Sequence, residues 1–145
     1  MPVRLFREAD FPRWIALRAE LWPEEAPAGL EAQGRTALAA EPPLTIFVAE
    51  EGGSVVGFLE LGFRAYAEGC TSSPVPYVEG WYVGADWRRR GIGGALMRAA
   101  EEWSRSRGFP ELASDTLADN RLSRTAHEAL GFEEMETLVV FRKAL

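Results

Sequence analysis

The sequence predicts one mixed α+β domain, and two observations carry that prediction. Stretches with apolar residues at three- and four-residue spacing, typical of helices, are interspersed with short β-branched and aromatic runs, typical of strands. The chain of 145 residues shows no internal repeat, low-complexity tract or linker, and this length suits a single core. We therefore expect one domain over residues 1–145 and one active site.

The expected elements follow from these patterns and from the residues that bound them. Asp10 stands where an N-cap would begin a helix, and Gly108 and Gly131 would each end one. Glu51-Gly52-Gly53 signals the turn of a hairpin. In chain order we expect a strand at 3–6, helices at 10–22 and 28–40, hairpin strands at 44–49 and 54–63, a loop at 65–74, a strand at 75–83, a helix at 92–107, a short strand at 111–116, a helix at 120–130, and a final strand or hairpin at 132–142.

Composition excludes some classes of function and leaves others open. The formal net charge is −6, which disfavours binding to the phosphate backbone, so we expect no nucleic-acid partner. The charge either favours a cationic partner or only keeps the protein soluble. Cys70 is the only cysteine, so a disulfide within the chain is impossible. No stretch reads as a membrane span or signal peptide, and we expect a cytoplasmic protein.

The most informative motif is Arg88-Arg89-Arg90-Gly91-Ile92-Gly93-Gly94, between an expected strand and an expected helix. A helix N-terminus presents unpaired N–H groups and the positive end of the helix dipole, and glycines let a diphosphate approach the backbone. Leu96 stands where a dinucleotide fingerprint needs its third glycine, and no Gly-Lys-Ser/Thr of a P-loop follows. The motif predicts either another kind of anion site or an exposed basic turn.

In this setting, Arg88-x-x-Gly91-x-Gly93 resembles the acyl-CoA pyrophosphate loop of the GNAT acetyltransferase superfamily, whose pattern is Gln/Arg-x-x-Gly-x-Gly/Ala. Asn120, the run at 126–132 and the order of the expected elements resemble the same superfamily along the whole chain. The resemblance implies the GNAT fold, a central, mostly antiparallel, splayed mixed sheet of six to seven strands flanked by about four helices. It also implies acetyl-CoA as cosubstrate and no metal.

The same resemblance implies which residues bind acetyl-CoA. The backbone amides of residues 89–94 would hold the pyrophosphate, and Asn120 would contact the pantetheine arm. Where many relatives carry a tyrosine proposed to protonate the departing thiolate, this chain has His127. His127 is therefore a proton donor, a residue that only faces CoA, or a structural residue with satisfied hydrogen bonds. The pantetheine and thioester would lie against Trp81, Tyr82 and Val83.

Acidic residues on the strands beside the thioester are the candidates for handling the amine. A carboxylate can hold the amine as a cation and accept or relay its proton. In the implied fold, Glu79, Asp115 and Glu136 lie on strands that border the cleft. Glu79 is the strongest catalytic candidate and Asp115 the second. The alternative is that each is an ordinary solvated carboxylate.

The run from Tyr66 to Val83, together with Ala113-Ser114-Asp115-Thr116 and residues 126–132, resembles the aminoglycoside 6'-N-acetyltransferases of type I. That resemblance implies a homodimer whose partner helps to complete the antibiotic cleft. It also implies aminoglycoside binding by Trp22, Tyr66, Glu79, Asp115 and Glu136. Because Trp22 continues the apolar stripe of the helix at 10–22, it is either a core residue or a ligand contact.

The mechanistic hypothesis is direct transfer in a ternary complex. The 6'-amine, deprotonated through Glu79 directly or by way of water, would attack the thioester carbonyl, which a backbone N–H near Val83 would polarise. Two alternatives stay open. One is acetylation of a polyamine, a protein N-terminus or another small amine, and the other is a non-catalytic acyl-CoA sensor.

Overall fold

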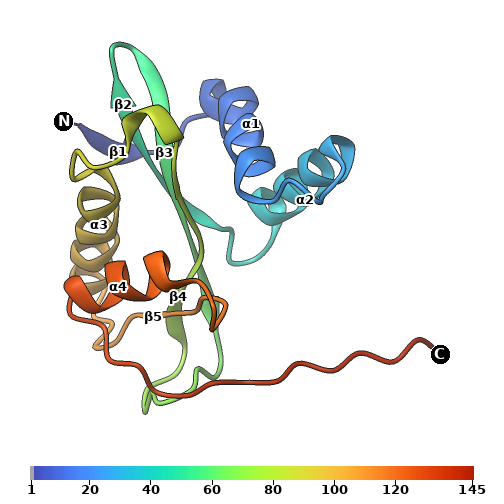
Figure 1. Cartoon of the computed structure of the whole chain (residues 1–145), viewed down its shortest axis with the longest axis vertical. Helices are drawn as coiled ribbons and strands as arrows, with labels where there is room; N and C mark the ends of the chain where they lie inside the picture. The colour runs from blue at the N-terminus through green and yellow to red at the C-terminus, as the bar shows by residue number, and fades with distance from the viewer. Residues whose placement is uncertain (1) are drawn as a thin grey trace.

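Five strands form one sheet, and helices lie on both of its faces (Figure 1). The computed structural model describes residues 2–145. The strand order is β1-β2-β3-β4-β5, antiparallel throughout except for the parallel pair β4 and β5. This confirms the predicted mixed α+β class. The elements are β1 (Val3–Leu5), the 3₁₀ turn η1 (Glu8–Asp10), α1 (Phe11–Leu21), α2 (Pro27–Ala39), β2 (Thr45–Glu51), β3 (Ser54–Arg64), β4 (Val75–Val83), the 3₁₀ turn η2 (Ala85–Trp87), α3 (Ile92–Ser106), β5 (Ala113–Ser114) and α4 (Arg121–Ala129).

The two faces of the sheet carry separate hydrophobic cores. Helices α1 and α2 cover one face, and α3 and α4 lie on the other (Figure 1). Side chains alternate between the faces along a strand, so Val48 and Phe58 join the core under α1, whereas Phe47 and Leu59 join the core under α3. Burial on both faces explains why β2 and β3 read as nearly continuous apolar runs. Within the described residues, no helix is long and apolar enough to cross a membrane.

The C-terminal segment differs from the prediction. The sequence predicts a final strand or hairpin at 132–142, but residues 133–145 form no strand and extend away from the body (Figure 1). Leu138, Val139, Val140 and Phe141 are 58% to 88% exposed. Their composition suits a strand, but a strand also needs backbone partners, and this segment has none in the described chain. The sheet therefore has five strands rather than the expected six to seven.

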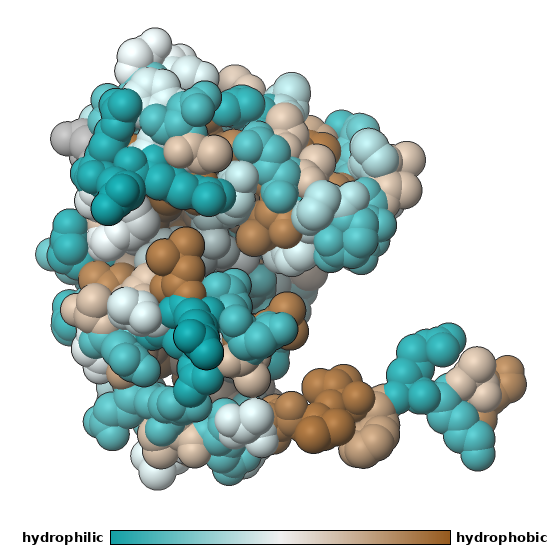
Figure 2. Space-filling model, viewed as in Figure 1, coloured by the Kyte–Doolittle hydropathy of each residue, from teal (hydrophilic) through white to brown (hydrophobic). Residues whose placement is uncertain are grey.

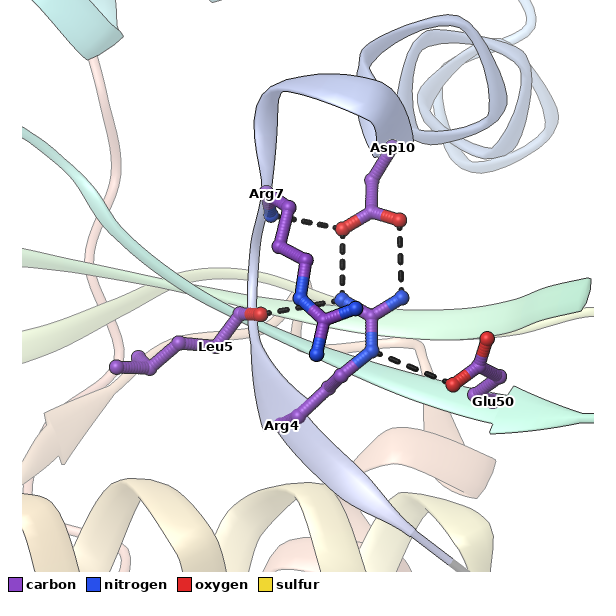
Figure 3. Close-up of polar contacts among 5 residues, drawn as sticks. All are labelled: Arg4, Leu5, Arg7, Asp10 and Glu50. Atoms are coloured by element: carbon purple, nitrogen blue, oxygen red, sulfur yellow. Dashed lines mark hydrogen bonds and ion pairs between the residues drawn. The ribbon is translucent and has the colours of Figure 1, made fainter.

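Asp10 is the N-cap residue of α1, as predicted, and it also ties the first strand to the start of this helix. Its side chain makes no capping hydrogen bond to α1. The carboxylate accepts hydrogen bonds from the Arg7 N–H (2.7 Å) and from two nitrogens of the Arg4 guanidinium (2.8 and 3.0 Å). Arg4 also donates to Glu50 on β2 at 3.3 Å (Figure 3). The buried carboxylate thus closes η1 and links it to the sheet edge.

Asp10→Asn should lower the free energy of unfolding by about 1–3 kcal/mol, because it removes the charge that pairs with two nitrogens of the Arg4 guanidinium. The Arg4 hydrogen bonds hold the pKa of Asp10 below its usual range, against the opposing effect of burial. Such a group stabilises the fold above its unfolded pKa of about 3.9, and this contribution is lost as pH falls through the lower folded pKa. Urea unfolding should therefore give a variant deficit that is full at pH 7 and shrinks below about pH 4.

Glu31→Gln is the control, because it removes the exposed Glu31–Arg35 pair on α2. It should change the free energy of unfolding by less than about 0.5 kcal/mol. An Asp10→Asn deficit that stays constant as the pH falls would contradict the role given to this carboxylate.

Candidate functional site

An open groove of about 650 Å³ lies between the end of β4 and the start of α3. Its walls come from β4, from η2 and the turn that follows it, and from the first turns of α3 and α4. Most of the residues predicted to bind acetyl-CoA are among those that line it. The lining residues are Trp81, Tyr82, Val83, Ala85, Trp87, Arg88, Arg89, Gly91, Ile92, Gly93 and Leu122.

The groove exists because β4 and β5 separate early. Their parallel pairing consists of Tyr77 opposite Ala113 and Val78 opposite Ser114. Beyond Val78, β4 continues to Val83 without β5 beside it. An unpaired strand edge presents backbone N–H and C=O groups to whatever occupies the gap. The predicted splayed sheet is thus present, and its open edge runs along the wall of the groove.

The turn into α3 requires glycine at Gly91. This residue is the N-cap of α3 and has φ +77°, in the left-handed region where a Cβ is unfavourable. Because α3 begins at Ile92, the N–H groups of its first turn have no partner within the helix. The Trp81 indole donates to the Gly93 carbonyl at 3.0 Å, and a Cβ on Gly93 would lie 3.5 Å from the same ring. The turn therefore presents backbone donors toward the groove.

The arginines of the turn surround these donors with positive charge. Arg88 donates to the Val83 carbonyl at 3.0 Å and lies over the Tyr82 ring, 5.3 Å from its centroid. Arg90 lies over Trp87 at 4.9 Å but does not line the groove. Together with the free N–H groups of α3, this cationic rim is suited to binding a phosphorylated ligand.

His127 and Asn120 have structural contacts of their own. The Asn120 side chain caps α4 by accepting the Ser123 N–H at 3.0 Å. His127 Nδ1 lies 2.7 Å from the Ser123 carbonyl, which can only accept, so Nδ1 carries the proton. Its Nε2 lies 2.7 Å from the Ser114 hydroxyl, and in the neutral ring it accepts a hydrogen bond from that group. The ring also packs edge-on against Trp81. Of the three readings of His127, this arrangement favours the structural one.

Glu79 is the extra residue of a β-bulge. Glu60 of β3 pairs with Gly80, and the next residue, Leu61, pairs with Val78. Glu79 lies between these two pairs and has no paired residue opposite it on β3. A bulge redirects side chains relative to the regular alternation of a strand. It therefore gives Glu79 a direction that strand periodicity alone does not provide.

The residues around the bulge show where Glu79 points. A Cβ on Gly62 would lie 3.2 Å from Glu79 Cγ and 3.7 Å from Leu44, which packs with the core under α1. A Cβ on Gly80 would lie 3.1 Å from the Trp22 ring. The two glycines thus leave room for Glu79 and Trp22 on the α1 side of the sheet.

An arginine side chain is bound to Glu79 and lies near Asp115, two of the acidic residues predicted to bind the substrate. Arg64, the last residue of β3, donates from Nε and Nη2 to the two oxygens of Glu79 at 2.9 and 2.7 Å. Its Nη2 lies 4.0 Å from Asp115 Oδ2. The guanidinium lies 3.5 Å from the centroid of the Tyr77 ring, whose hydroxyl donates to Asp115 at 2.8 Å. Burial and the Asp115 hydrogen bond raise the pKa of Tyr77, so this hydroxyl keeps its proton.

A second, buried ion pair lies directly behind the bulge. Arg18 of α1 donates to Glu60 at 2.8 Å, and the Trp14 indole donates to the same carboxylate oxygen at 3.0 Å. Arg18 also donates to the Leu30 carbonyl of α2 and lies against both Trp14 and Trp22. Burial raises the pKa of Glu60, and Arg18 opposes that effect. Half-buried Trp22 is therefore part of this packing and also reaches β4 beside Glu79.

The remaining two predicted substrate residues lie outside the helices and strands. Tyr66, in the loop between β3 and β4, is 69% exposed. Glu136 lies in the extended C-terminal segment, not on a strand beside the cleft as predicted. Its neighbour Met135 packs against Gly69 of the same loop. The structure thus brings together Glu79, Asp115 and Trp22, but does not bring Glu136 to them.

Sequence reasoning missed several residues of the site. Arg64 and Arg18 were not candidates, because an arginine at a strand end or in a helix stripe carries no local signal of its partner. Trp87 and Leu122 line the groove. The sequence signal for Trp87 is an aromatic residue in a polar connection. The signal for Leu122 is a leucine in the first turn of a predicted helix, and in the structure this leucine is exposed.

Comparison with known proteins assigns this architecture to a family. Residues 11–132 match the Acetyltransferase (GNAT) family. The chain belongs to the GNAT family. It is 40% identical to an aminoglycoside N(6')-acetyltransferase type 1 of Klebsiella aerogenes, over 99% of this chain and 96% of that protein. It is 37% identical to the protein of the same name in Salmonella enteritidis, over 99% of each.

Solved structures of GNAT enzymes support the same conclusion. AAC(6')-Iy in complex with the bisubstrate analogue CoA-S-monomethyl-acetylneamine superposes with a TM-score of 0.91 at 36% identity, covering 99% of this chain and 98% of that one. The apo structure of AAC(6')-IG from Acinetobacter haemolyticus gives a TM-score of 0.90 at 33% identity, covering 100% and 99%. The GNAT fold predicted from the sequence is confirmed.

Proposed function

We propose that this GNAT enzyme transfers the acetyl group of acetyl-CoA to the 6'-amine of aminoglycosides, and that it thereby confers resistance to them. The observation that carries the proposal is the position of Glu79. It lies on the bulge of β4, two residues before Trp81 in the wall of the groove. Through Arg64 it is linked to Asp115, and we call Glu79 and Asp115 together the acidic cluster. An amine held by these carboxylates would meet an acyl donor in the groove. The similarity to type 1 enzymes over 99% of the chain supports this substrate class.

The groove supplies the acetyl-CoA half of the site. The first-turn N–H groups of α3 and the arginines at 88–90 suit a diphosphate, and the Gly91 turn lets it approach the backbone. Trp81, Tyr82 and Val83 form a wall along the open edge of β4 that suits the pantetheine arm. When bound, acetyl-CoA supplies the thioester that the amine attacks. Asn120 stays a proposed contact to the same arm.

The acidic cluster supplies the aminoglycoside half. Glu79 and Asp115 would bind ammonium groups of the drug, and the aromatic faces of Trp22 and Tyr66 would cover its sugar rings. Glu136 would join them from the C-terminal segment. The net charge of −6 would help to attract a polycationic substrate.

In the proposed mechanism Glu79 accepts a proton from the 6'-ammonium, directly or through water, and so produces the neutral amine that attacks the thioester carbonyl carbon. The C–N bond forms, the C–S bond breaks, and CoA leaves as the thiol with the second proton that the amine nitrogen loses. Asp115 holds a second ammonium and thereby fixes the orientation of the drug. A backbone N–H near Val83, on the stretch of β4 that β5 does not cover, would donate to the carbonyl oxygen. Both ring nitrogens of His127 are engaged, so we give it the role of holding Trp81 in place.

We further propose that the enzyme is a homodimer in which each chain exchanges its C-terminal segment with the other. The segment carries a contiguous apolar surface (Figure 2), and soluble proteins seldom leave such a surface uncovered. Strand β5 ends the sheet and has an open edge that an extended segment of a second copy could pair with. Exchange would also bring Glu136 of one chain toward the site of its partner. The free thiol of Cys70 fits a reducing compartment, and we propose the cytoplasm.

The exchanged segment can be tested by light scattering coupled to size exclusion. The wild type should elute with twice the chain mass, and replacing both Val139 and Phe141 by Lys should give a folded monomer, because buried charges disfavour the apolar interface. Arg142→Gln, on the same segment, should remain dimeric. A monomeric wild type, or a double variant that stays dimeric, would rule out the exchange.

The turn can be tested with two glycines that have the same backbone strain. Gly91 and Gly53 both have φ +77°, and an added Cβ would meet no atom within 4 Å at either position. Substituting either by Ala should lower the free energy of unfolding by about 1–2 kcal/mol. Only Gly91→Ala should weaken acetyl-CoA binding in calorimetry, by about tenfold, since it displaces the donors of the turn. Equal effects of the two substitutions on acetyl-CoA binding would contradict the assignment.

Glu79→Gln should lower kcat/KM for kanamycin by about 10² to 10⁴-fold, because it removes the proposed proton acceptor. Acetyl-CoA affinity and circular dichroism should stay unchanged. Glu101→Gln, which removes a carboxylate paired with Arg105 on α3, should retain full activity. The assay should measure CoA release with kanamycin, gentamicin and spermidine, and mass analysis should identify the acetylated amine. Near-normal turnover by Glu79→Gln would remove Glu79 from the mechanism.

A further inference from the structure

Arg64 neutralises the two carboxylates that the proposed function reserves for the substrate. Its guanidinium uses two nitrogens to bind both oxygens of Glu79, and it lies 4.0 Å from Asp115. This fork geometry is the strongest form of an arginine–carboxylate pair. In the ligand-free protein, the acidic cluster therefore already holds a cation.

The surroundings of Arg64 hold the guanidinium over the cluster. The Tyr77 ring lies under it, and the Tyr77 hydroxyl is occupied by Asp115. Gly62 has no side chain and leaves room for Glu79 beside the arginine. The Glu79 hydrogen bonds raise the pKa of Arg64, so it stays charged. The Tyr77 ring and the carboxylates of Glu79 and Asp115 thus form a binding site for one planar cation.

The Arg64–Glu79 pair is nevertheless open to exchange. The two side chains are 42% and 32% exposed, whereas those of the buried Arg18–Glu60 pair are 9% and 2% exposed. Ion pairs that water can reach contribute little net free energy, because water and other ions compete for both partners. An incoming ammonium can therefore replace Arg64 at Glu79, while Arg18 stays fixed.

We propose that Arg64 is a specificity-determining residue that occupies the substrate's cation site and is displaced when a polycation binds. This inference rests on the proposed function. An amine with one ammonium group gains too little from one carboxylate to displace an arginine held by two. A substrate with several ammonium groups engages Glu79 and Asp115 together and can displace it. Displacement also frees the oxygens of Glu79, so the proton acceptor becomes available only when such a substrate is bound.

The experiment compares two amines in the wild type and in Arg64→Gln. Kanamycin carries several ammonium groups, and 6-amino-6-deoxyglucose carries a single amine at the equivalent position. Arg64→Gln should raise kcat/KM for the monoamine by about threefold to fivefold through a lower KM, the range expected for an exposed ion pair. Kanamycin also has to displace Arg64, so its own kcat/KM should rise too, but by a smaller factor, and the kcat/KM ratio of kanamycin to monoamine should therefore fall below that of the wild type. The KM for acetyl-CoA should not change.

Two variants serve as controls. Arg64→Lys keeps the charge but not the two-nitrogen fork, so it should give a ratio between those of the wild type and Arg64→Gln. Arg124→Gln removes a similarly exposed arginine that binds both oxygens of Glu134 at 2.9 and 3.1 Å, away from the acidic cluster. It should leave the ratio unchanged, which separates the effect of this site from a general change in surface charge.

Opposite results would overturn the proposal. If Arg64→Gln raises the KM for kanamycin, or lowers kcat equally for both amines, Arg64 contacts the substrate or shapes Glu79 instead of being displaced. If the wild type acetylates no aminoglycoside, the proposed function fails separately. Calorimetric titration of kanamycin then decides the inference, because tighter binding to Arg64→Gln supports displacement and equal or weaker binding refutes it.

Discussion

The two neighbours of β4 determine the geometry of the site. On one side, β5 pairs with β4 only at Tyr77 and Val78, which leaves the rest of that edge open. On the other side, β3 pairs along the strand but with a bulge that adds Glu79. A single strand therefore carries an open backbone edge and, two residues away, a redirected carboxylate, and the proposed function gives one to each substrate. Bringing two reactants together in this way is what direct transfer chiefly requires.

The strand that carries both features has to be held firmly, and the buried pair behind it does this. Arg18 connects α1, the Leu30 carbonyl of α2 and Glu60 of β3, and it lies between two tryptophans. A buried ion pair adds little stability compared with an apolar core, but removing one partner leaves an uncompensated charge. Here the pair acts by fixing positions, because it holds Trp22 and helices α1 and α2 against the bulge of β4.

The sequence signalled the parts of this site that depend on local chemistry. Gly91 and the arginines before it mark a helix N-terminus whose chemistry suits an anion, and the groove lies at this position. Glu79 was a candidate because it lies close to that turn on the preceding strand. The bulge depends on the pairing register of β3 and β4, which no single segment encodes. The partner of Arg64 depends on the same register, so this arginine was missed. The segment at 132–142 has the composition of a strand, but pairing needs an edge that the composition cannot specify.

The Arg18–Glu60 and Arg64–Glu79 pairs have similar N–O distances and lie close together, with Glu60 on β3 and Glu79 on β4. The first pair is buried and the second is exposed, so they differ in how easily the arginine can be replaced. Glu60 and Glu79 are close enough for the charge of Glu79 to help raise the pKa of Glu60. Each carboxylate therefore needs a cation nearby, and losing either cation would disturb the other pair. Exchanging Arg64 for a substrate ammonium replaces one positive charge by another, so the field at buried Glu60 stays nearly constant. In the proposed displacement, the outer pair would exchange its cation during each turnover while the inner pair keeps the strand in place.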